Sequence, residues 1–546
     1  MTAWNVAEGD GYELHFGYPD ERAFSEVVEQ LVSDKVASGI ARRDATLWGS
    51  AAEPEAGKRL SWVDLAEASR PLVVDIATLR KEFLDKGLSR FVLCGMGGSS
   101  LAPEVICTSA GVDLEVLDSS NPDVVRAAVT DRLDETVVIV SSKSGGTVET
   151  DSQKRAFEQA FRDAGIEPEE RIVVVTDPDS PLDKEATEAG YTVFRADPDV
   201  GGRYSALTAF GLVPSGLAGA DISELLDDAA ALHPHLAGDS VDNPALRLGG
   251  LLGWASTQGI DKVVLANAGA SFSGFGDWAE QLLAESTGKD GKGILPVVVE
   301  SLDSPNFTPS TPDSVLVSFG PDFPFDTRRP ASSVGASVNA PLGAQMLLWE
   351  FATAVAGRVI GINPFDQPDV ESAKAAAREM LDGAGESPAP RFTDGAISVF
   401  AGDWLVDTTS SAADALATLI DVLDPERGYL AVQAYLDRHR DSDLAQCRPA
   451  LAGRTGRPVT FGWGPRFLHS TGQYHKGGPA TGVYLQVTGN PVEDLAVPGR
   501  EFTFGDFLIA QAVGDAQVLA DKGRPVLRLH LDDLEAGLQQ LRSLLS

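Results

Sequence analysis

The sequence is poor in several kinds of residue, and each shortage narrows the class of protein. Its 546 residues include three cysteines, Cys94, Cys107 and Cys447, without paired spacing. Such a set argues against both a disulfide framework and a zinc site, so we expect no metal. No apolar run approaches the ~20 residues of a membrane-spanning helix, and no basic leader precedes an apolar stretch, so we expect neither a membrane span nor a signal peptide. A cytoplasmic protein follows as the expectation.

Basic residues are also scarce. The chain has 44 Lys and Arg against 80 Asp and Glu, a formal net charge of −36. A negative field of this size disfavours nucleic acid and anionic membranes as partners. An anionic small molecule would need a locally positive pocket in a negative protein.

The length exceeds one ordinary core, so we expect two or three packed units. Short β-branched runs alternate with helical segments, which is typical of doubly wound parallel sheets. The fold class we predict is α/β, with two such subdomains and a C-terminal α/β region. The expected divisions are a helical N-terminal segment over 1–60, a first subdomain over 61–235, a second over 236–385 and a C-terminal region over 392–546.

Two glycine- and serine-rich turns each follow an apolar run, at 95–100 and at 142–147. A strand, a glycine turn and a helix N-terminus together present backbone N–H groups to a phosphate. Neither turn matches the Walker pattern or the dinucleotide fingerprint, and one such turn alone is usually only a connection. Two together favour a sugar phosphate as ligand. The candidate ligands are Gly97, Gly98, Ser99, Ser142, Lys143, Ser144 and Thr147.

Further segments hold polar residues beside glycines or at helix ends. Arg203 follows two glycines and presents a rigid donor fork for an oxyanion, or else forms a surface ion pair. Glu285 ends an amphipathic segment and either projects into a pocket or is a solvated helix-end residue. Gln367 and Lys374 fall on one face of a helix, which is otherwise an ordinary capped helix.

Two of the seven histidines, His469 and His475, lie six residues apart in a glycine-rich polar loop. Histidines in such a loop suit general acid–base work near neutral pH. A surface loop is the alternative.

In this order, the segments resemble the glucose-6-phosphate isomerase family. The resemblance rests on Gly-Met-Gly-Gly-Ser at 95–99, Ser-Lys-Ser-Gly-Gly-Thr at 142–147, Gly-Gly-Arg-Tyr-Ser at 201–205, Glu-Ser-Thr-Gly-Lys at 285–289 and Phe-Asp-Gln…Val-Glu-x-x-Lys at 365–374. It spans about residues 90–375 and is most similar to the long actinobacterial form, also like the isomerase half of transaldolase–isomerase fusions. Membership implies two sugar-isomerase (SIS) subdomains, no metal and no organic cofactor.

The resemblance also implies roles. Glu285 would move the proton between C1 and C2 of the sugar, Arg203 would face the enediolate, and Lys374 would assist ring opening. Gln367 would complete a pocket whose phosphate end is Ser99, Ser142, Lys143, Ser144 and Thr147.

One departure concerns histidine. The common isomerases have a catalytic histidine between the glutamate and the final helix, but this chain has none from 286 to 374. We therefore expect the C-terminal region to supply it, with His475 preferred for its Gln-x-His spacing and His469 close behind. In the common enzymes the histidine comes from a partner subunit, so either a homodimer or a monomer is expected here. A second departure is Asp369, where the family has glycine, and it implies no catalytic role.

Alternatives within and outside enzymes stay open. A broader isomerase would also accept mannose 6-phosphate. A non-catalytic sugar-phosphate sensor would usually have a basic DNA-binding helix, which this acidic chain lacks. An independent activity in the C-terminal region has no motif of its own.

Overall fold

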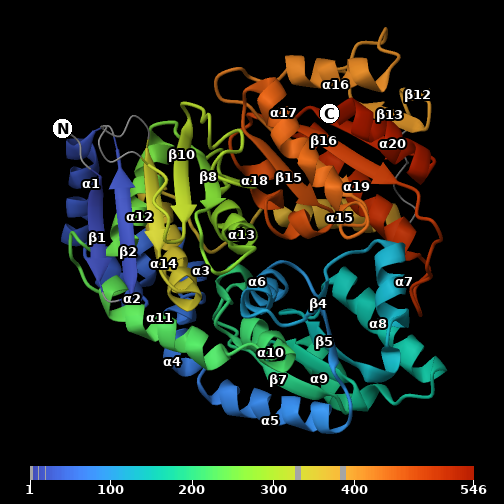
Figure 1. The fold of residues 1–546 in the computed structure, drawn as a ribbon, viewed down its shortest axis with the longest axis horizontal. Helices are drawn as coiled ribbons and strands as arrows, with labels where there is room; N and C mark the ends of the chain where they lie inside the picture. Colours follow the sequence, from blue (N-terminus) through green and yellow to red (C-terminus); the bar gives the residue numbers. More distant parts are fainter. Residues whose placement is uncertain (1–3, 10, 19, 326–333, 382–388, 546) are drawn as a thin grey trace.

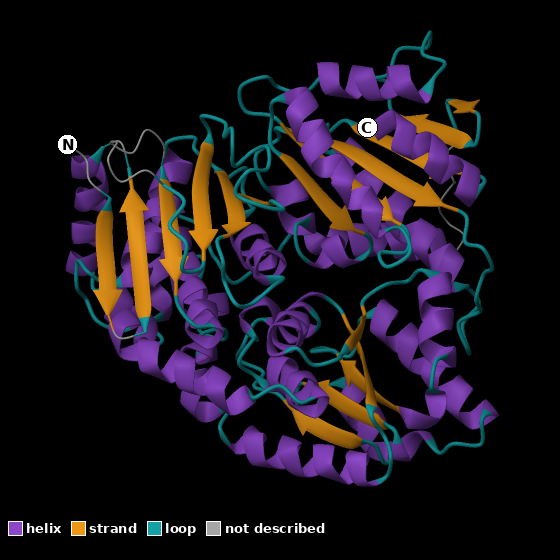
Figure 2. Cartoon of the chain, in the orientation of Figure 1, coloured by secondary structure: helices purple, strands orange, loops and turns teal. Residues whose placement is uncertain are grey.

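The computed structural model describes residues 4–9, 11–18, 20–325, 334–381 and 389–545, apart from the side chains at 371, 373, 374 and 380. Three sheets, each flanked by helices, form the described part of the chain (Figures 1 and 2). The α/β fold class predicted from the sequence is confirmed.

The first sheet is wholly parallel, in the order β4-β3-β5-β6-β7. Runs such as Thr-Val-Val-Ile-Val-Ser in β5 are buried on both faces, as expected for parallel strands covered by helices. Helices α5, α6 and α10 cover one face, and α7, α8 and α9 cover the other. The strands are β3 (Arg90–Gly95), β4 (Glu115–Leu117), β5 (Thr136–Ser141), β6 (Ile172–Thr176) and β7 (Thr192–Arg195); the helices are α5 (Pro71–Asp85), α6 (Leu101–Ala110), α7 (Pro122–Thr130), α8 (Val148–Asp163), α9 (Pro181–Glu188) and α10 (Ala209–Ala218).

The second sheet has the order β1-β2-β11-β10-β8-β9. Its four later strands are parallel, and the hairpin β1–β2 joins β11 antiparallel. The strands are β1 (Asn5–Gly9), β2 (Tyr12–Gly17), β8 (Lys262–Asn267), β9 (Leu295–Val298), β10 (Ser314–Phe319) and β11 (Gly335–Asn339). Its helices, with those that precede the first sheet, are α1 (Glu21–Ser33), α2 (Val36–Ala41), α3 (Glu53–Ala56), α4 (Leu65–Ala68), α11 (Ile222–Leu236), α12 (Pro244–Thr257), α13 (Phe275–Thr287), α14 (Leu342–Ile360) and α15 (Val370–Leu381).

The expectation of a helical N-terminal segment over 1–60 is wrong for its first part, which forms the strands β1 and β2. Tyr12, Leu14 and Phe16 are buried on one side of β2, while the residues between them are more exposed. This period of two is the pattern of a strand with one covered face. The hairpin therefore belongs to the second sheet, more than 300 residues away in sequence.

The third sheet, in the C-terminal region, has the order β12-β13-β17-β16-β14-β15. Helices α16, α17 and α20 cover one face, and α18 and α19 lie on the other. The strands are β12 (Phe392–Asp394), β13 (Ile397–Ala401), β14 (Tyr429–Tyr435), β15 (Val459–Trp463), β16 (Gly482–Gly489) and β17 (Val526–Leu531); the helices are α16 (Ala412–Asp421), α17 (Cys447–Thr455), α18 (Gly472–Gly477), α19 (Phe504–Asp521) and α20 (Leu534–Leu545).

The second and third sheets share a strand order. In each, the four parallel strands follow the order 2-1-3-4, and an antiparallel hairpin extends the sheet beyond strand 4. Apolar residues of the second sheet, including Val264 and Leu316, pack with Tyr429 and Tyr484 of the third. The C-terminal region thus covers the face of the second sheet that its own helices leave open.

Candidate active site

The two glycine turns lie side by side at the carboxyl ends of β3 and β5. These strands pair in parallel, with Gly95 opposite Ser141. The position is the topological switch point of the first sheet, where open α/β folds bind ligands. The first turn forms a short 3-10 helix, η3 (Gly97–Ser99), and the second leads directly into α8.

Glycine is required at both central positions of the first turn. Gly97 has φ of +55°, and a Cβ there would lie 2.9 Å from the carbonyl oxygen of His469. A Cβ on Gly98 would lie 1.9 Å from the carbonyl oxygen of Gly202, at the start of the 3-10 helix η6 (Gly202–Tyr204). The glycines therefore allow this turn to touch both the backbone before Arg203 and the C-terminal region.

The second turn presents hydroxyls and the start of a helix. Ser142 Oγ donates to Thr147 Oγ1 over 3.2 Å, and Gly146 N donates to Ser144 Oγ over 3.2 Å. Thr147 is the N-cap of α8 but makes no side-chain capping bond. Hydroxyls beside a helix N-terminus are the environment that a phosphate group prefers.

Lys143 is engaged by protein partners. Its ammonium donates to Asp177 Oδ2 at 2.7 Å and to the carbonyl of Pro198 at 3.0 Å. Lys143 lines the cleft, but its charge is shared with a carboxylate.

Arg203 is 3% exposed, and its guanidinium is fully used. Nε donates to Ser286 Oγ at 2.8 Å, Nη1 to Gln367 Oε1 at 2.9 Å, and Nη2 to the carbonyls of Pro364 and Asp366. The prediction that this arginine enters a cleft rather than forming a surface pair fits its burial. Because its fork is fixed on several sides, its positive charge cannot swing away during a reaction.

Glu285 lies in the last turn of α13 and faces Arg203. Its Oε1 is 3.5 Å from Arg203 Nη1, and its Oε2 accepts from Gln281 Nε2 at 3.1 Å. The second contact joins residues four apart, which share a helix face. Glu285 is thus a cleft carboxylate and not a solvated helix end.

Lys289 holds the segment that precedes α15. Its buried ammonium donates to the carbonyl of Asn363 and, at 2.7 Å, to Asp366 Oδ1. Burial and the nearby Arg203 guanidinium lower the pKa of Lys289 to about 8. This lysine anchors the backbone that presents Gln367 to Arg203.

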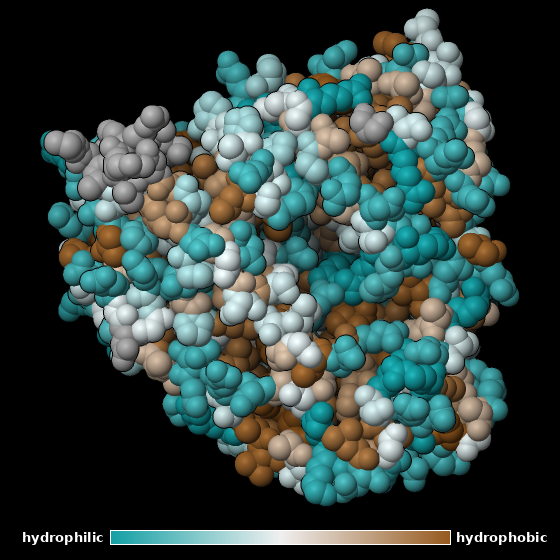
Figure 3. All heavy atoms as spheres, viewed as in Figure 1, coloured by the Kyte–Doolittle hydropathy of each residue, from teal (hydrophilic) through white to brown (hydrophobic). Residues whose placement is uncertain are grey.

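These groups surround one cleft of about 470 Å³. The surface is hollowed where the three units meet (Figure 3). The cleft brings together most of the residues predicted from the sequence. They are Gly97, Gly98, Ser99, Ser142, Lys143, Ser144, Thr147, Arg203, Glu285, Gln367 and His469. Lys374 belongs to α15, but its side chain lies outside the described residues.

His469 reaches this cleft from the C-terminal region, at the end of the 3-10 helix η8 (Arg466–His469). Its Nε2 lies 2.8 Å from Glu149 Oε1, and Gln511 Nε2 donates to the same oxygen at 2.7 Å. The carbonyl of His469 accepts from Gln281 Nε2 at 2.7 Å. A carboxylate on one ring nitrogen fixes the orientation of the imidazole.

His475 does not line the cleft. It is 2% exposed, lies among Tyr429, Phe467 and Tyr484, and has Gln433 Nε2 at 3.2 Å from its Nδ1. Burial lowers its pKa well below the ordinary histidine value. The preference for His475 over His469 therefore has no geometric support, because the spacing that suggested it places the ring in the core.

Sequence reasoning missed Gln281 and Glu149. Gln281 precedes Glu285 by one helical turn, and Glu149 lies in the first turn of the helix after the phosphate-type turn. Each lies within four residues of a predicted site residue, so the sequence could have indicated both positions. The loop around His469, which contacts both, is distant in sequence, and no local pattern links it to them.

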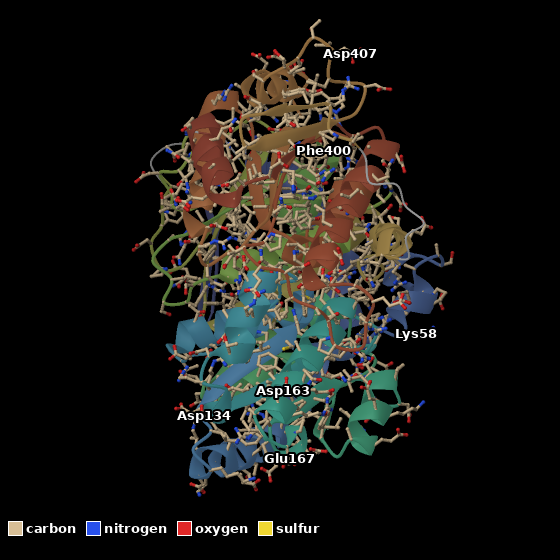
Figure 4. The ribbon with its side chains drawn as sticks, turned by 90° about the vertical axis from the view of Figure 1, so that its right-hand side faces the viewer. Lys58, Asp134, Asp163, Glu167, Phe400 and Asp407 are labelled. Carbon is tan, nitrogen blue, oxygen red and sulfur yellow. The ribbon has the colours of Figure 1, made fainter. Side chains whose placement is uncertain are left out.

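Part of the excess acidic charge lies on the outer surface. Figure 4 shows Asp134, Asp163 and Glu167 on the first subdomain and Asp407 at the far end of the C-terminal region. All four are exposed. The cleft lining holds three permanent cations, Arg59, Lys143 and Arg203, against two carboxylates, Asp177 and Glu285. The lining is therefore less acidic than the chain as a whole.

Within the described residues, no group of three or more His, Cys, Asp or Glu side chains is arranged to hold a metal ion. No helix of the described part of the chain is long and apolar enough to cross a membrane.

Comparison with known proteins finds similarity to sugar-phosphate isomerases. The sequence model of the family "Phosphoglucose isomerase" matches residues 79–294. A probable glucose-6-phosphate isomerase of Haloquadratum walsbyi is 28% identical over 393 residues, covering 63% of this chain and 91% of that protein. A glucose-6-phosphate isomerase of Staphylococcus saprophyticus is 33% identical over 260 residues, covering 43% of this chain and 57% of that protein.

Among solved structures, a glucose-6-phosphate isomerase of Chlamydia trachomatis is similar with a TM-score of 0.56 and 20% identity, covering 70% of this chain and 91% of that one. At this identity the likeness shows the fold alone.

Proposed function

We propose that this chain, a member of the phosphoglucose isomerase family, interconverts glucose 6-phosphate and fructose 6-phosphate. The observation that supports this most directly is the placement of Glu285 beside Arg203, 3.5 Å apart, in a cleft whose other wall is the hydroxyl-rich start of α8. The names of similar proteins, glucose-6-phosphate isomerases, support glucose 6-phosphate and fructose 6-phosphate as the substrates.

The phosphate group would bind at the second glycine turn. Ser142, Ser144 and Thr147 offer hydroxyls, and the N-terminal amides of α8 add partial positive charge. Lys143 would contribute positive electrostatic potential at the phosphate rather than a direct hydrogen bond, because its ammonium already bonds Asp177 and the Pro198 carbonyl.

Glu285 would then carry the proton between C1 and C2. A carboxylate removes the proton next to the carbonyl, and the charge that develops on the enediolate oxygens lies beside the guanidinium of Arg203. A pre-fixed arginine stabilises that charge without reorganisation at the moment of reaction. Gln367, bonded to Arg203 Nη1, keeps the fork in this orientation.

Ring opening needs an acid–base group near the ring oxygen, and His469 is the histidine of the described cleft lining. Glu149 accepts a hydrogen bond from its Nε2, which leaves Nδ1 for the sugar. For Lys374, a part in ring opening is supported by the family resemblance alone. Since the histidine comes from the same chain, the site is complete in a monomer, and we propose that a dimer is not required. We also propose a cytoplasmic location.

The test is a coupled isomerase assay on wild type and Glu285→Gln, with fructose 6-phosphate and mannose 6-phosphate offered separately. We expect turnover of fructose 6-phosphate to fall by about 10³-fold or more in the variant, while binding of the sugar phosphate stays within a few-fold, because an amide cannot accept the proton. Loss of binding without loss of turnover would contradict the role. Turnover of mannose 6-phosphate by wild type would extend the function to a broader phosphosugar isomerase.

A further inference from the structure

The turn that carries His469 begins at a buried arginine. Arg466, the first residue of η8, is 9% exposed. Its Nη1 donates to Asp118 Oδ2 at 2.9 Å, and its Nη2 donates to Glu104. Both carboxylates belong to the first subdomain, Glu104 in α6 and Asp118 directly after β4.

A second arginine of the C-terminal region meets the same carboxylates. Arg438, in the loop after β14, donates to Glu104 Oε1 at 2.7 Å and to the carbonyl of Val116 at 3.1 Å, and its Nε lies 3.6 Å from Asp118 Oδ1. We call Arg438, Arg466, Glu104 and Asp118 the arginine clamp. Asp118 is 2% exposed. Because two planar guanidinium groups bind two carboxylates, the clamp defines both the distance and the angle between the first subdomain and the C-terminal region.

Three separate contacts therefore fix His469. Its ring bonds Glu149 of the first subdomain, its carbonyl accepts from Gln281 of the second, and the base of its turn is held by the clamp. Within η8, Ser470 N donates to the carbonyl of Phe467, so the turn is short and internally bonded. A displacement at Arg466 is transmitted to His469 because only two residues separate them.

We propose that Arg466 is a positioning residue for His469, and that the arginine clamp sets the ring-opening step without touching the sugar. This inference rests on the proposed function. A catalytic group must be held within about 0.5 Å of its productive place, and a shift of about 1 Å costs on the order of 10²-fold in rate. Arg466 is thus a determinant of the reaction although it is absent from the cleft lining.

The test separates ring opening from proton transfer. 5-Deoxyfructose 6-phosphate lacks the hydroxyl that closes the furanose ring and stays open-chain, so it needs Glu285 but not His469. We compare fructose 6-phosphate turnover with exchange of the C1 proton of 5-deoxyfructose 6-phosphate in heavy water. For Arg466→Gln we expect kcat/KM for fructose 6-phosphate to fall about 10²-fold, and exchange on the open-chain analogue to stay within about 3-fold of wild type.

A matched control is Arg448→Gln. Arg448 is 2% exposed and ties the C-terminal region to the second subdomain through Glu300, with Nε to Oε1 at 2.6 Å, and it does not contact η8. We expect this variant to lower the melting temperature and to leave the ratio of the two activities unchanged. Arg466→Lys keeps the charge but loses the planar guanidinium group. Its kcat/KM for fructose 6-phosphate should therefore lie between the values for wild type and Arg466→Gln.

A double variant, Arg466→Gln with His469→Ala, tests whether Arg466 acts through His469. If Arg466 acts through His469, then Arg466→Gln adds little to the loss caused by His469→Ala on fructose 6-phosphate. The positioning role would be overturned if Arg466→Gln and Arg466→Lys both left the ratio of the two activities unchanged, as equal losses on both substrates would. Additive losses in the double variant would also overturn it. Failure of the proposed function looks different, since wild type would then be inactive on both substrates.

Discussion

Two neighbouring pieces of the C-terminal region, η8 and α18, contact the rest of the molecule in different ways. Through Arg466, η8 meets the first subdomain by ion pairs. Helix α18 meets the second subdomain mainly by packing, with Tyr474 fully buried among apolar residues of the second and third sheets. Gln473 adds hydrogen bonds, donating from Nε2 to the carbonyl of Gly288 at 2.8 Å and to Asp369 Oδ2 at 2.9 Å. The histidines at the ends of this stretch follow the same division, since His469 lies in the cleft and His475 in the core.

The difference separates orientation from stability. Ion pairs are directional, whereas buried apolar area stabilises with little regard to angle. We infer that η8 sets where the cleft histidine lies and that α18 keeps the C-terminal region attached. Four predictions, in order of decreasing effect, test this contrast and the charge on the cleft wall.

The largest effect is expected from the histidines. His469→Ala should lower turnover of fructose 6-phosphate by about 10²- to 10⁴-fold, the usual worth of a general acid–base, and spare the open-chain analogue. His475→Ala should keep most of the activity and lower the melting temperature, because it removes a buried ring. Assays of both variants on both substrates decide this, and a reversed pattern would return the ring-opening role to His475.

The next effect concerns α18. A Cβ on Gly288 would lie 2.4 Å from the Cα of Tyr474, so Gly288→Ala pushes α18 away from α13. We expect a loss of about 3 kcal/mol in the free energy of unfolding. The control is Gly453→Ala, in α17, where nothing lies within 4 Å and a small gain is expected. Denaturant unfolding measures both, and equal stabilities would show that the α18 contact is loose.

A smaller effect depends on pH and tests the ionic side. Burial raises the pKa of Glu104, but Arg466 and Arg438 outweigh it and lower the pKa from 4.5 to about 2. The fold therefore favours the ionised form, and this stabilisation is full above about pH 4.5 and is lost as the pH falls through 2. Glu104→Gln should lower the free energy of unfolding by on the order of 2 kcal/mol near pH 7.

The gap between wild type and Glu104→Gln should then close as the pH falls from 4.5 toward 2. Glu167→Gln, at an exposed site, should stay within about 0.5 kcal/mol of wild type throughout. Unfolding curves between pH 2 and 7 provide the measurement. A gap that does not change with pH would mean that the clamp contributes packing and not charge.

The smallest effect is expected at Lys143. Because its ammonium already bonds Asp177 and the Pro198 carbonyl, Lys143→Met should raise KM for fructose 6-phosphate by less than about 5-fold. Lys143→Arg is the matched variant that keeps the charge. A rise of 100-fold in KM would show instead that the ammonium binds the phosphate directly.

The parts of the site that the sequence predicted share a physical basis. Glycines at 97 and 98 and the hydroxyls at 142, 144 and 147 follow strands, so their location depends on local chemistry and on parallel pairing alone. Arg203, after two glycines, and Glu285, at the end of an amphipathic segment, were candidates from local pattern, and the family resemblance implied their roles.

What the sequence left undecided depends on contacts between distant segments. The local difference between His469 and His475, the Gln-x-His spacing, favours the ring that the packing of α18 buries. The hairpin over 5–17 has the alternation of a strand, but its partner β11 lies near residue 337, beyond the range of any local pattern. Glu149 and Gln281 gain their roles only when the C-terminal region closes over them.

The hairpin also has a consequence for how the chain reaches its folded state. During synthesis the first sheet can assemble as soon as residues up to about 195 have emerged, since all of its strands lie between 90 and 195. The strand β2, made earlier, must wait for β11 and so keeps an unpaired edge while more than 300 residues are added. Unpaired edges in nascent chains attract other strands. The hairpin over 5–17 is therefore open to wrong strand pairing for longer than the strands of the first sheet.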